Sequence, residues 1–497
     1  MFLPEYDKHD AIGLSELVQK GDVSPQDLLR AAIERIEARN PALNAVVLEL
    51  FARAKERVDT LPEGPLKGIP FLLKDLKATL AGTPTSNSTL LSKDRKAEVS
   101  SVLVKRYEAA GLQIVGKTNT PEFGIMGITE PALRGPCRNP WNIAHTPGGS
   151  SGGSASAVAA RIVPAAHAGD GGGSIRIPAS ACGLFGLKPT RGRVSMSPHL
   201  GEAWGGYVQE HVVSRSVRDS ALLLDIADQR TPGEPYVAPT RTRPWLEEVG
   251  QASGTLRIAY RKETLYAGTT HPDCLAAVED AITLLTDLGH EVVEASPTFP
   301  KEEMVRAYFF TIASGVAAVV EETAERAGKK PSPADFEPQT WVLAQVGWSL
   351  NAPELVRSQQ LIQRAARDVA NFFEEYDMLL TSTLAEPPIE VGALALKSSE
   401  RLQLAFLRAL PLRSLFEKAL DSLGTNALSR TPNTQLFNQT GQPAMSVPLY
   451  WNQKGLPIGV QLAAGFGRED QLFRLASQLE EARPWAQRTG WEVAFAK

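Results

Sequence analysis

Helical segments alternate with short apolar runs over much of this chain, and that order limits the possible folds more than any other feature. A helical pattern over residues 98–110 is followed by the apolar run "LQIVGKTN", and the same order returns in "HPDCLAAVEDAITLLTDLGHEVVEAS". Strand-like "PAMSVPL" and "PIGVQLAA" then precede a final helix predicted at residues 468–482. Such alternation indicates an α/β fold with a sheet between helical layers.

Two local signals place the first elements of this fold. The stretch "SPQD" supplies a capping serine, a proline and an acid immediately before an amphipathic helix predicted at residues 25–39. Further along, "GPLKGIPFLLKDL" has the pattern of a buried strand that ends on charged residues, with Lys74 at its end.

The chain has no linker, low-complexity stretch or fixed-period repeat that would divide it. Residues 300–435 follow a mainly helical pattern, between segments where helices and strands alternate. We therefore predict a single domain over residues 1–497, with residues 300–435 as a helical insertion.

Charge and composition exclude several classes of partner. Lysine and arginine total 52 against 56 acids, a net charge of -4, so there is no basic excess to hold a nucleic acid. The segment "MFLPEYDKHD" lacks the features of a secretory signal, and the longest uncharged stretch, about 139–160, is too rich in Gly, Ser and Pro to span a membrane. We expect a cytoplasmic protein, monomeric or homodimeric.

The three cysteines predict neither a disulfide framework nor a zinc site. Cys137, Cys182 and Cys274 are far apart in sequence and have no CxxC spacing. We expect buried thiols in a reducing compartment, and we expect no metal and no cofactor.

Two glycine-serine stretches, "TPGGSSGGS" at 146–154 and "AGDGGGSIR" at 168–176, are the candidates for chemistry. Neither contains the GxxxxGK[ST] or GxGxxG motif of a nucleotide site, and no lysine follows a serine by three positions. The first satisfies the loose GxSxG pattern of a nucleophile elbow, although the residues before it do not form a strand pattern. If these stretches were only flexible turns, there would be no reason for Ser174 to follow three consecutive backbone N–H donors, which is the arrangement that an oxyanion hole requires.

The residues "PGGSSGGSASAVAA", then "GDGGGSIRIPASACGLFGLKPTRGRVS", and "LKGIPFLLKDL" upstream resemble the amidase signature family. The resemblance is strongest over residues 66–195, the signature core. It implies a central mixed β-sheet flanked by helices on both faces. It also implies a Ser-cisSer-Lys triad, with Ser174 as nucleophile, Ser150 as the bridging serine after a cis peptide bond, and Lys74 as base.

Each role in this triad has a physical reason. A serine hydroxyl becomes nucleophilic when a neighbouring base removes its proton, and a neutral lysine amine can do so if burial lowers its pKa. Lys74 must therefore be desolvated, and Ser150 would relay the proton between base and nucleophile. Although His167 is nearer in sequence to the nucleophile, we expect it to be structural.

The resemblance implies further roles around the nucleophile. The N–H groups of Gly171, Gly172 and Gly173, with that of Ser174, would form an oxyanion hole. We expect Ser151, Asp170 and Arg176 to hold the glycine-serine turns in place. We expect the segment "GIMGIT", which contains Met126 and Ile128, to form one wall of the pocket. Many family members have a bulkier residue at position 171, so we expect a wider pocket floor here. The aromatic residues Phe309, Phe310, Trp341 and Trp348 are candidates for a second wall.

The sequence thus predicts an amide hydrolase that forms an acyl-enzyme on Ser174 and acts on a small linear, cyclic or aryl amide. The "GDGGGSIRIPAS" variant is similar to that of bacterial family members that open small amides. Three alternatives remain open: an amidotransferase A subunit that works with partner subunits, a carbamate or ester hydrolase on the same triad, and a binding protein without catalysis.

Overall fold

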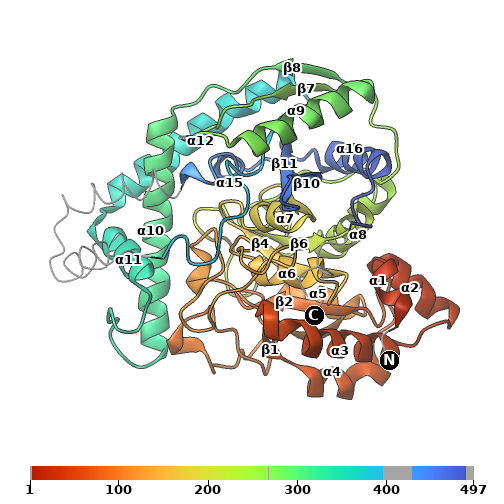
Figure 1. The fold of residues 1–497 in the computed structure, drawn as a ribbon. Coiled ribbons are helices and arrows are strands. Elements are labelled where there is room, and N and C mark those ends of the chain that lie inside the picture. Colours follow the sequence, from red (N-terminus) through yellow and green to blue (C-terminus); the bar gives the residue numbers. More distant parts are fainter. Residues whose placement is uncertain (1–2, 267, 396–427, 489–497) are drawn as a thin grey trace.

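One mixed sheet of eleven strands organises the protein, which is described here by a computed structural model for residues 3–266, 268–395 and 428–488 (Figure 1). The strand order is β1-β3-β2-β4-β6-β5-β10-β11-β9-β7-β8. The strands are β1 (Val46–Glu49), β2 (Pro70–Lys74), β3 (Gln113–Thr118), β4 (Ala165–Asp170), β5 (Phe185–Lys188), β6 (Gln209–Ser214), β7 (Arg257–Tyr260), β8 (Glu291–Glu294), β9 (Met378–Ser382), β10 (Ala444–Trp451) and β11 (Pro457–Ala464).

Parallel and antiparallel pairs are both present, as the resemblance implied. Strand β2 runs parallel to β3 and β4, and β7 runs parallel to β8 and β9. The strands between these two groups pair in antiparallel fashion, from β4 through β6, β5, β10 and β11 to β9.

Helices cover both faces of the sheet, because successive strand residues point to opposite sides. In β2, Phe71 and Leu73 pack into one apolar cluster, with α2 (Ala11–Lys20), α5 (Val102–Ala109), α8 (Val217–Ala227), α9 (Pro272–Asp287) and α16 (Glu469–Ala482). Leu72 points into the other cluster, with α3 (Pro25–Leu43), α4 (Phe51–Arg57), α6 (Gly152–Ala159) and α7 (Arg176–Cys182). A short α1 (Pro4–Lys8) precedes them.

The predicted elements are confirmed where their patterns were clear. The helix expected at 25–39 is α3, with Ser24 as N-cap and Asp27 completing a capping box. Lys74 is the last residue of β2, and the final predicted helix is α16. Cys137, Cys182 and Cys274 are free and buried.

The region 300–435 is less separate than expected. Within it, α10 (Lys301–Arg326), α11 (Pro338–Ser349) and α12 (Ala352–Glu375) pack together at one side of the molecule (Figure 1). Strand β9 follows them and joins the main sheet between β11 and β7, so this region is also part of the central fold. Residues 396–427 of the predicted insertion lie outside the described residues.

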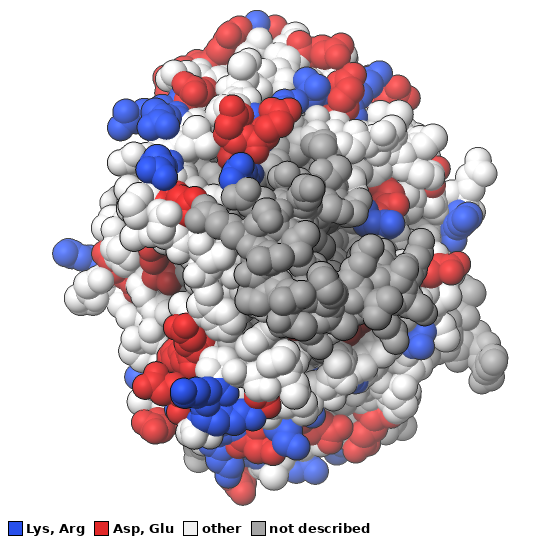
Figure 2. Space-filling view, turned by 90° about the vertical axis from the view of Figure 1, so that its left-hand side faces the viewer, with Lys and Arg blue, Asp and Glu red and all other residues white. Residues whose placement is uncertain are grey.

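Helix α10 is the one helix among the described residues that is long and apolar enough to cross a membrane by length and composition. Its most apolar window is 56% buried within the protein, where it packs on α11 and α12. Such burial is typical of a core helix. On this side of the molecule, acidic and basic side chains lie close to one another around the edges (Figure 2).

Candidate active site

The candidate catalytic residues come from two neighbouring strands and the loops that follow them. Lys74 ends β2, whereas Ser174 lies in the loop between β4 and α7. Because β2 and β4 are adjacent and parallel, their carboxyl ends meet at one edge of the sheet, where α/β folds bind ligands. The first glycine-serine loop, which ends at α6, joins them there through a hydrogen bond from the Ser151 N–H to the Ser174 carbonyl (3.3 Å).

Lys74 is buried among hydroxyl and carbonyl groups. Its Nζ is hydrogen-bonded to Ser150 Oγ at 2.7 Å and to Ser151 Oγ at 3.0 Å, and it lies 3.4 Å from the Gly169 carbonyl oxygen. Lys74 is 1% exposed and Ser150 2% exposed. The peptide bond between Gly149 and Ser150 is cis, as the resemblance implied.

Burial lowers the pKa of Lys74 to about 7. The loss of hydration disfavours the ammonium form, and the positive charge of Lys77 adds to this effect. The negative charges of Glu210 and Asp170 act in the opposite direction. A substantial fraction of Lys74 is therefore neutral near pH 7, which is the state that a general base requires.

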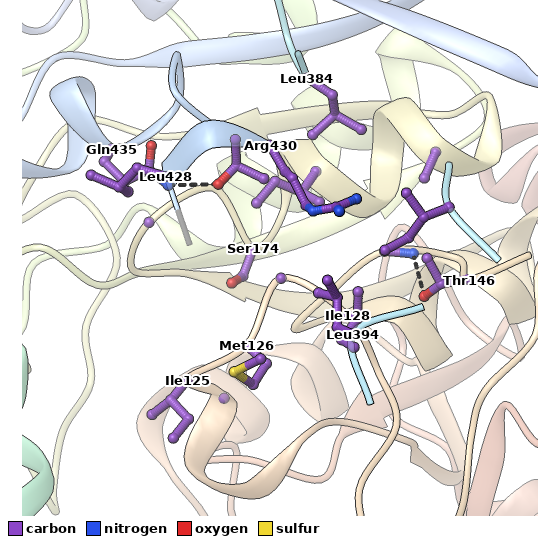
Figure 3. A pocket seen from close by; sticks show the side chains of 18 of the residues that line it. Ile125, Met126, Ile128, Thr146, Ser174, Leu384, Leu394, Leu428, Arg430 and Gln435 are labelled. Carbon is purple, nitrogen blue, oxygen red and sulfur yellow. Dashed lines mark hydrogen bonds between the residues drawn. The ribbon is translucent and has the colours of Figure 1, made fainter. Parts of the chain in front are cut away.

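Ser174 is half-buried at the wall of a cavity, and Figure 3 shows its hydroxyl beside the labelled pocket residues. Among the described residues, no hydrogen bond joins its hydroxyl to Ser150. The predicted relay therefore has its base and bridging serine in contact, while its last link, from Ser150 to Ser174, remains a prediction. Catalytic hydrogen bonds often shorten only when substrate binds.

The loop before Ser174 is held by its carbonyl groups. The Tyr308 hydroxyl lies 3.4 Å from the Gly171 carbonyl oxygen, and the Thr434 hydroxyl donates to the Gly172 carbonyl at 2.7 Å. A trans peptide directs its N–H away from its carbonyl, so these contacts fix where the neighbouring donors point. Gly172 and Ser174 line the cavity.

One of the predicted oxyanion donors is engaged elsewhere. The N–H of Gly173 donates to Asp170 Oδ1 at 2.6 Å, so the prediction for Gly173 is wrong. Among the described residues, the N–H groups of Gly171, Gly172 and Ser174 have no such partner. They remain the candidate donors to an oxyanion.

Asp170 and Arg176 form a buried ion pair beneath this loop, in agreement with their predicted supporting role. Arg176 Nη2 lies 2.9 Å from Asp170 Oδ1, and both side chains are 0% exposed. Burial acts to raise the pKa of Asp170, but Arg176 and the amide of Asn438 outweigh it and lower the pKa to about 2. Arg176 also donates to Gln461 Oε1 at 2.7 Å, which ties the loop to β11.

His167 contacts Lys74, the candidate base, and among the described residues it makes no hydrogen bond to Ser174. It is buried on β4, and its Nδ1 accepts a hydrogen bond from the backbone N–H of Lys74 at 3.3 Å. Its Nε2 lies 2.8 Å from Glu210 Oε2. Because Nδ1 accepts, the proton of a neutral ring is on Nε2, which faces the carboxylate.

A cavity of about 170 Å³ opens in front of Ser174. Met126 and Ile128 line it, as predicted, on the side opposite Leu384 and Leu428 (Figure 3). The predicted aromatic wall is confirmed only for one residue, since Phe309 lines the cavity whereas Phe310, Trp341 and Trp348 do not.

The wider pocket floor expected at Gly171 is absent. A Cβ atom added to this glycine would lie 2.7 Å from Cζ3 of Trp204, so the indole already fills the space that a side chain would take. This prediction was wrong because a residue far along the chain supplies the bulk.

Several functional residues escaped the sequence reasoning. Tyr308, Thr434 and Asn438 hold the nucleophile loop from distant segments, although "FNQTGQ" around Asn438 belongs to a stretch that weakly resembles the family. Arg430 and Glu386 line the cavity and form an ion pair with each other. Among the described residues, no group of three or more His, Cys, Asp or Glu side chains is arranged to hold a metal ion.

Comparison with known proteins identifies the class. The family model described as "Amidase" matches residues 27–473. The 6-aminohexanoate-cyclic-dimer hydrolase of Pseudomonas sp. (strain NK87) is 36% identical over 486 residues, which cover 96% of each chain.

Solved structures are similar over almost the whole chain. The 6-aminohexanoate cyclic dimer hydrolase complexed with substrate has a TM-score of 0.89 and 35% identity, covering 97% of this chain and 99% of that one. A bacterial aryl acylamidase has a TM-score of 0.85 and 26% identity, covering 98% and 99%. The fold and these matches define an amide hydrolase, an enzyme that acts on carbon–nitrogen bonds. The chain belongs to the amidase signature family.

Proposed function

We propose that this enzyme hydrolyses a small, uncharged linear, cyclic or aryl amide through an acyl-enzyme on Ser174. The observation that carries the proposal is the buried contact between Lys74 and Ser150, with a lysine pKa of about 7, beside a glycine loop whose Gly172 and Ser174 line the cavity. These are a base, a relay and an electrostatic site for the oxyanion, which acyl transfer from an amide requires.

The reaction follows from this arrangement. Neutral Lys74 takes the Ser150 proton while Ser150 takes the Ser174 proton, and Ser174 Oγ bonds to the amide carbon. The carbonyl oxygen becomes negative beside the N–H groups of Gly172 and Ser174. The C–N bond then breaks as Lys74 returns its proton, through Ser150, to the leaving nitrogen. Water attacks the ester by the same proton route and releases the acid.

The cavity supports an uncharged substrate body. Among the described residues its walls are largely apolar, and the two charged side chains among them, Arg430 and Glu386, neutralise each other. An isolated charge on the substrate would find no free partner in this pair and would lose hydration. The relative that hydrolyses 6-aminohexanoate cyclic dimer acts on an amide without free ends, and an aryl anilide also meets this requirement.

The test compares the cyclic dimer of 6-aminohexanoate, its linear dimer and an acyl anilide as substrates for the purified chain. We expect hydrolysis of an uncharged amide, with a preference for the cyclic over the linear dimer. The variant Ser174→Ala should lose turnover and labelling by a fluorophosphonate, whereas Ser15→Ala, a matched control far from the site, should keep both. Labelling of Ser174→Ala at the wild-type rate, or full activity in Lys74→Ala, would refute the proposed mechanism.

A further inference from the structure

Two cavities meet at Trp204. The first, of about 170 Å³, contains Ser174. The second, of about 620 Å³, is lined by Lys77, His167 and Val316, among others. Among the described residues that line them, Trp204 is the only one that belongs to both. The indole therefore stands between the nucleophile and a larger space.

Opposite edges of this indole pack closely against two glycines. A Cβ added at Gly171, in the nucleophile loop, would lie 2.7 Å from Cζ3, and a Cβ added at Gly315, on α10, would lie 2.6 Å from Cδ1. Lys77 Nζ lies 5.7 Å from the ring centroid, and Lys77 lines the second cavity. The ring thus extends from the nucleophile loop to α10 and closes the space between them.

The backbone that carries this ring is in the left-handed conformation. Trp204 has a φ of 53°, and Gly205 and Gly206 follow with φ of 62° and 82°. Left-handed backbone is unfavourable for a bulky residue and persists where the surrounding structure enforces it, often at functional sites. The ring is half-buried, and the described residues give its nitrogen no hydrogen bond, so the packing around the ring and the Lys77 ammonium hold it.

We propose that Trp204 is the residue that sets the length of the substrate group accepted beside the oxyanion loop, and that the cavity behind it is a latent extension of the substrate pocket. This inference rests on the proposed function. It assigns the wild-type enzyme amides that are short on this side of the scissile bond. Removal of the indole would join the two cavities, so that an alkyl chain could pass between Gly171 and Gly315 into the larger one.

The experiment measures kcat/KM for two substrate series, acyl p-nitroanilides from acetyl to decanoyl and hexanamides with N-alkyl groups of increasing length. Each enzyme is scored by the ratio of long to short substrates, which cancels any general loss of activity. We expect Trp204→Ala to extend the optimum in one series, gaining about two- to fourfold for each added methylene that becomes buried. The conservative variant Trp204→Phe should keep the wild-type profile.

A second substitution tests the path itself. In Trp204→Ala with Gly315→Leu, the new side chain refills the space from α10, and the gain for long substrates should disappear. If Trp204→Ala is poorly folded by thermal melting, Trp204→Leu replaces it. An unchanged length profile in both series, with wild-type activity on short substrates, overturns the inference and leaves the proposed function standing. If the wild type showed no hydrolysis of these amides that depends on Ser174, the proposed function itself would be refuted.

Discussion

Replacement of the buried base should stabilise the protein while abolishing catalysis. Lys74 has a pKa of about 7 in the folded protein and 10.5 as its ordinary value. Below pH 7 Lys74 is charged in both the folded and the unfolded protein, and burying its ammonium therefore costs about 5 kcal/mol, at about 1.4 kcal/mol per pKa unit. Lys74→Met removes this cost but also loses the hydrogen bonds to Ser150 and Ser151, each contributing about 1 kcal/mol. The expected net gain is about 3 kcal/mol at mildly acidic pH.

The sign of the pH dependence follows from proton binding. Between pH 7 and 10.5 the unfolded wild type binds more protons at Lys74 than the folded protein does, so wild-type stability rises with pH in this window. The gain in free energy of unfolding of Lys74→Met over the wild type is therefore at its maximum below about pH 7, and it falls by about 3 kcal/mol between about pH 6.5 and 9.5.

Urea unfolding of both proteins at these two pH values measures the effect, with the exposed Lys20→Met as the matched control. The control should show no such pH-dependent difference from the wild type. A Lys74→Met protein less stable than the wild type at pH 6.5, by the same amount as at pH 9.5, would mean that Lys74 stays charged in the fold.

Three further outcomes are expected. Glu210→Gln should move the acidic limb of the kcat/KM profile to lower pH, and Lys77→Met should move it to higher pH, because the carboxylate raises the pKa of Lys74 and the ammonium lowers it. Profiles of kcat/KM against pH measure both shifts, and a shift of both variants in the same direction would contradict this expectation. Gly172→Ala places a Cβ 2.1 Å from the Tyr308 hydroxyl and should cost at least about a hundredfold in kcat, with part of the activity restored by adding Tyr308→Phe. Asp170→Asn leaves a buried arginine without its counter-charge and should cost about 3–5 kcal/mol in urea unfolding; an unchanged midpoint would refute that role.

The sequence was sufficient for the parts of the site that short segments build. The capping signal at Ser24 gave helix α3, and the apolar run before Lys74 gave β2, because local pattern and final structure agree there. The glycine-serine loops could be recognised as turns at element ends for the same reason. The grouping of Lys74, Ser150 and Ser174 came from the resemblance and not from periodicity, and the structure adds that β2 and β4 are neighbouring parallel strands.

The remaining features depend on side-chain contacts that hydrophobic periodicity does not encode, one within the nucleophile loop and one between distant segments. The Gly173 N–H turns toward Asp170 because the loop wraps around the buried ion pair with Arg176. Trp204 fills the space beside Gly171 from a loop more than thirty positions away, as the sequence numbering shows. Neither arrangement leaves a periodic or spacing signal, so the predicted oxyanion donors and pocket floor both needed correction.

The charges around Lys74 indicate why burial alone is an incomplete account of its basicity. Burial lowers the pKa, and with no opposing charge it would lower it further, to the point where a neutral amine is always present but accepts a proton weakly. Glu210 limits this decrease, and its carboxylate also lies 2.8 Å from His167, whose ring supports the Lys74 backbone. One carboxylate therefore influences both the proton affinity and the position of the base. For this reason Glu210→Gln should lower the maximal rate as well as the pKa, whereas a purely structural carboxylate would change the rate without moving the pH profile.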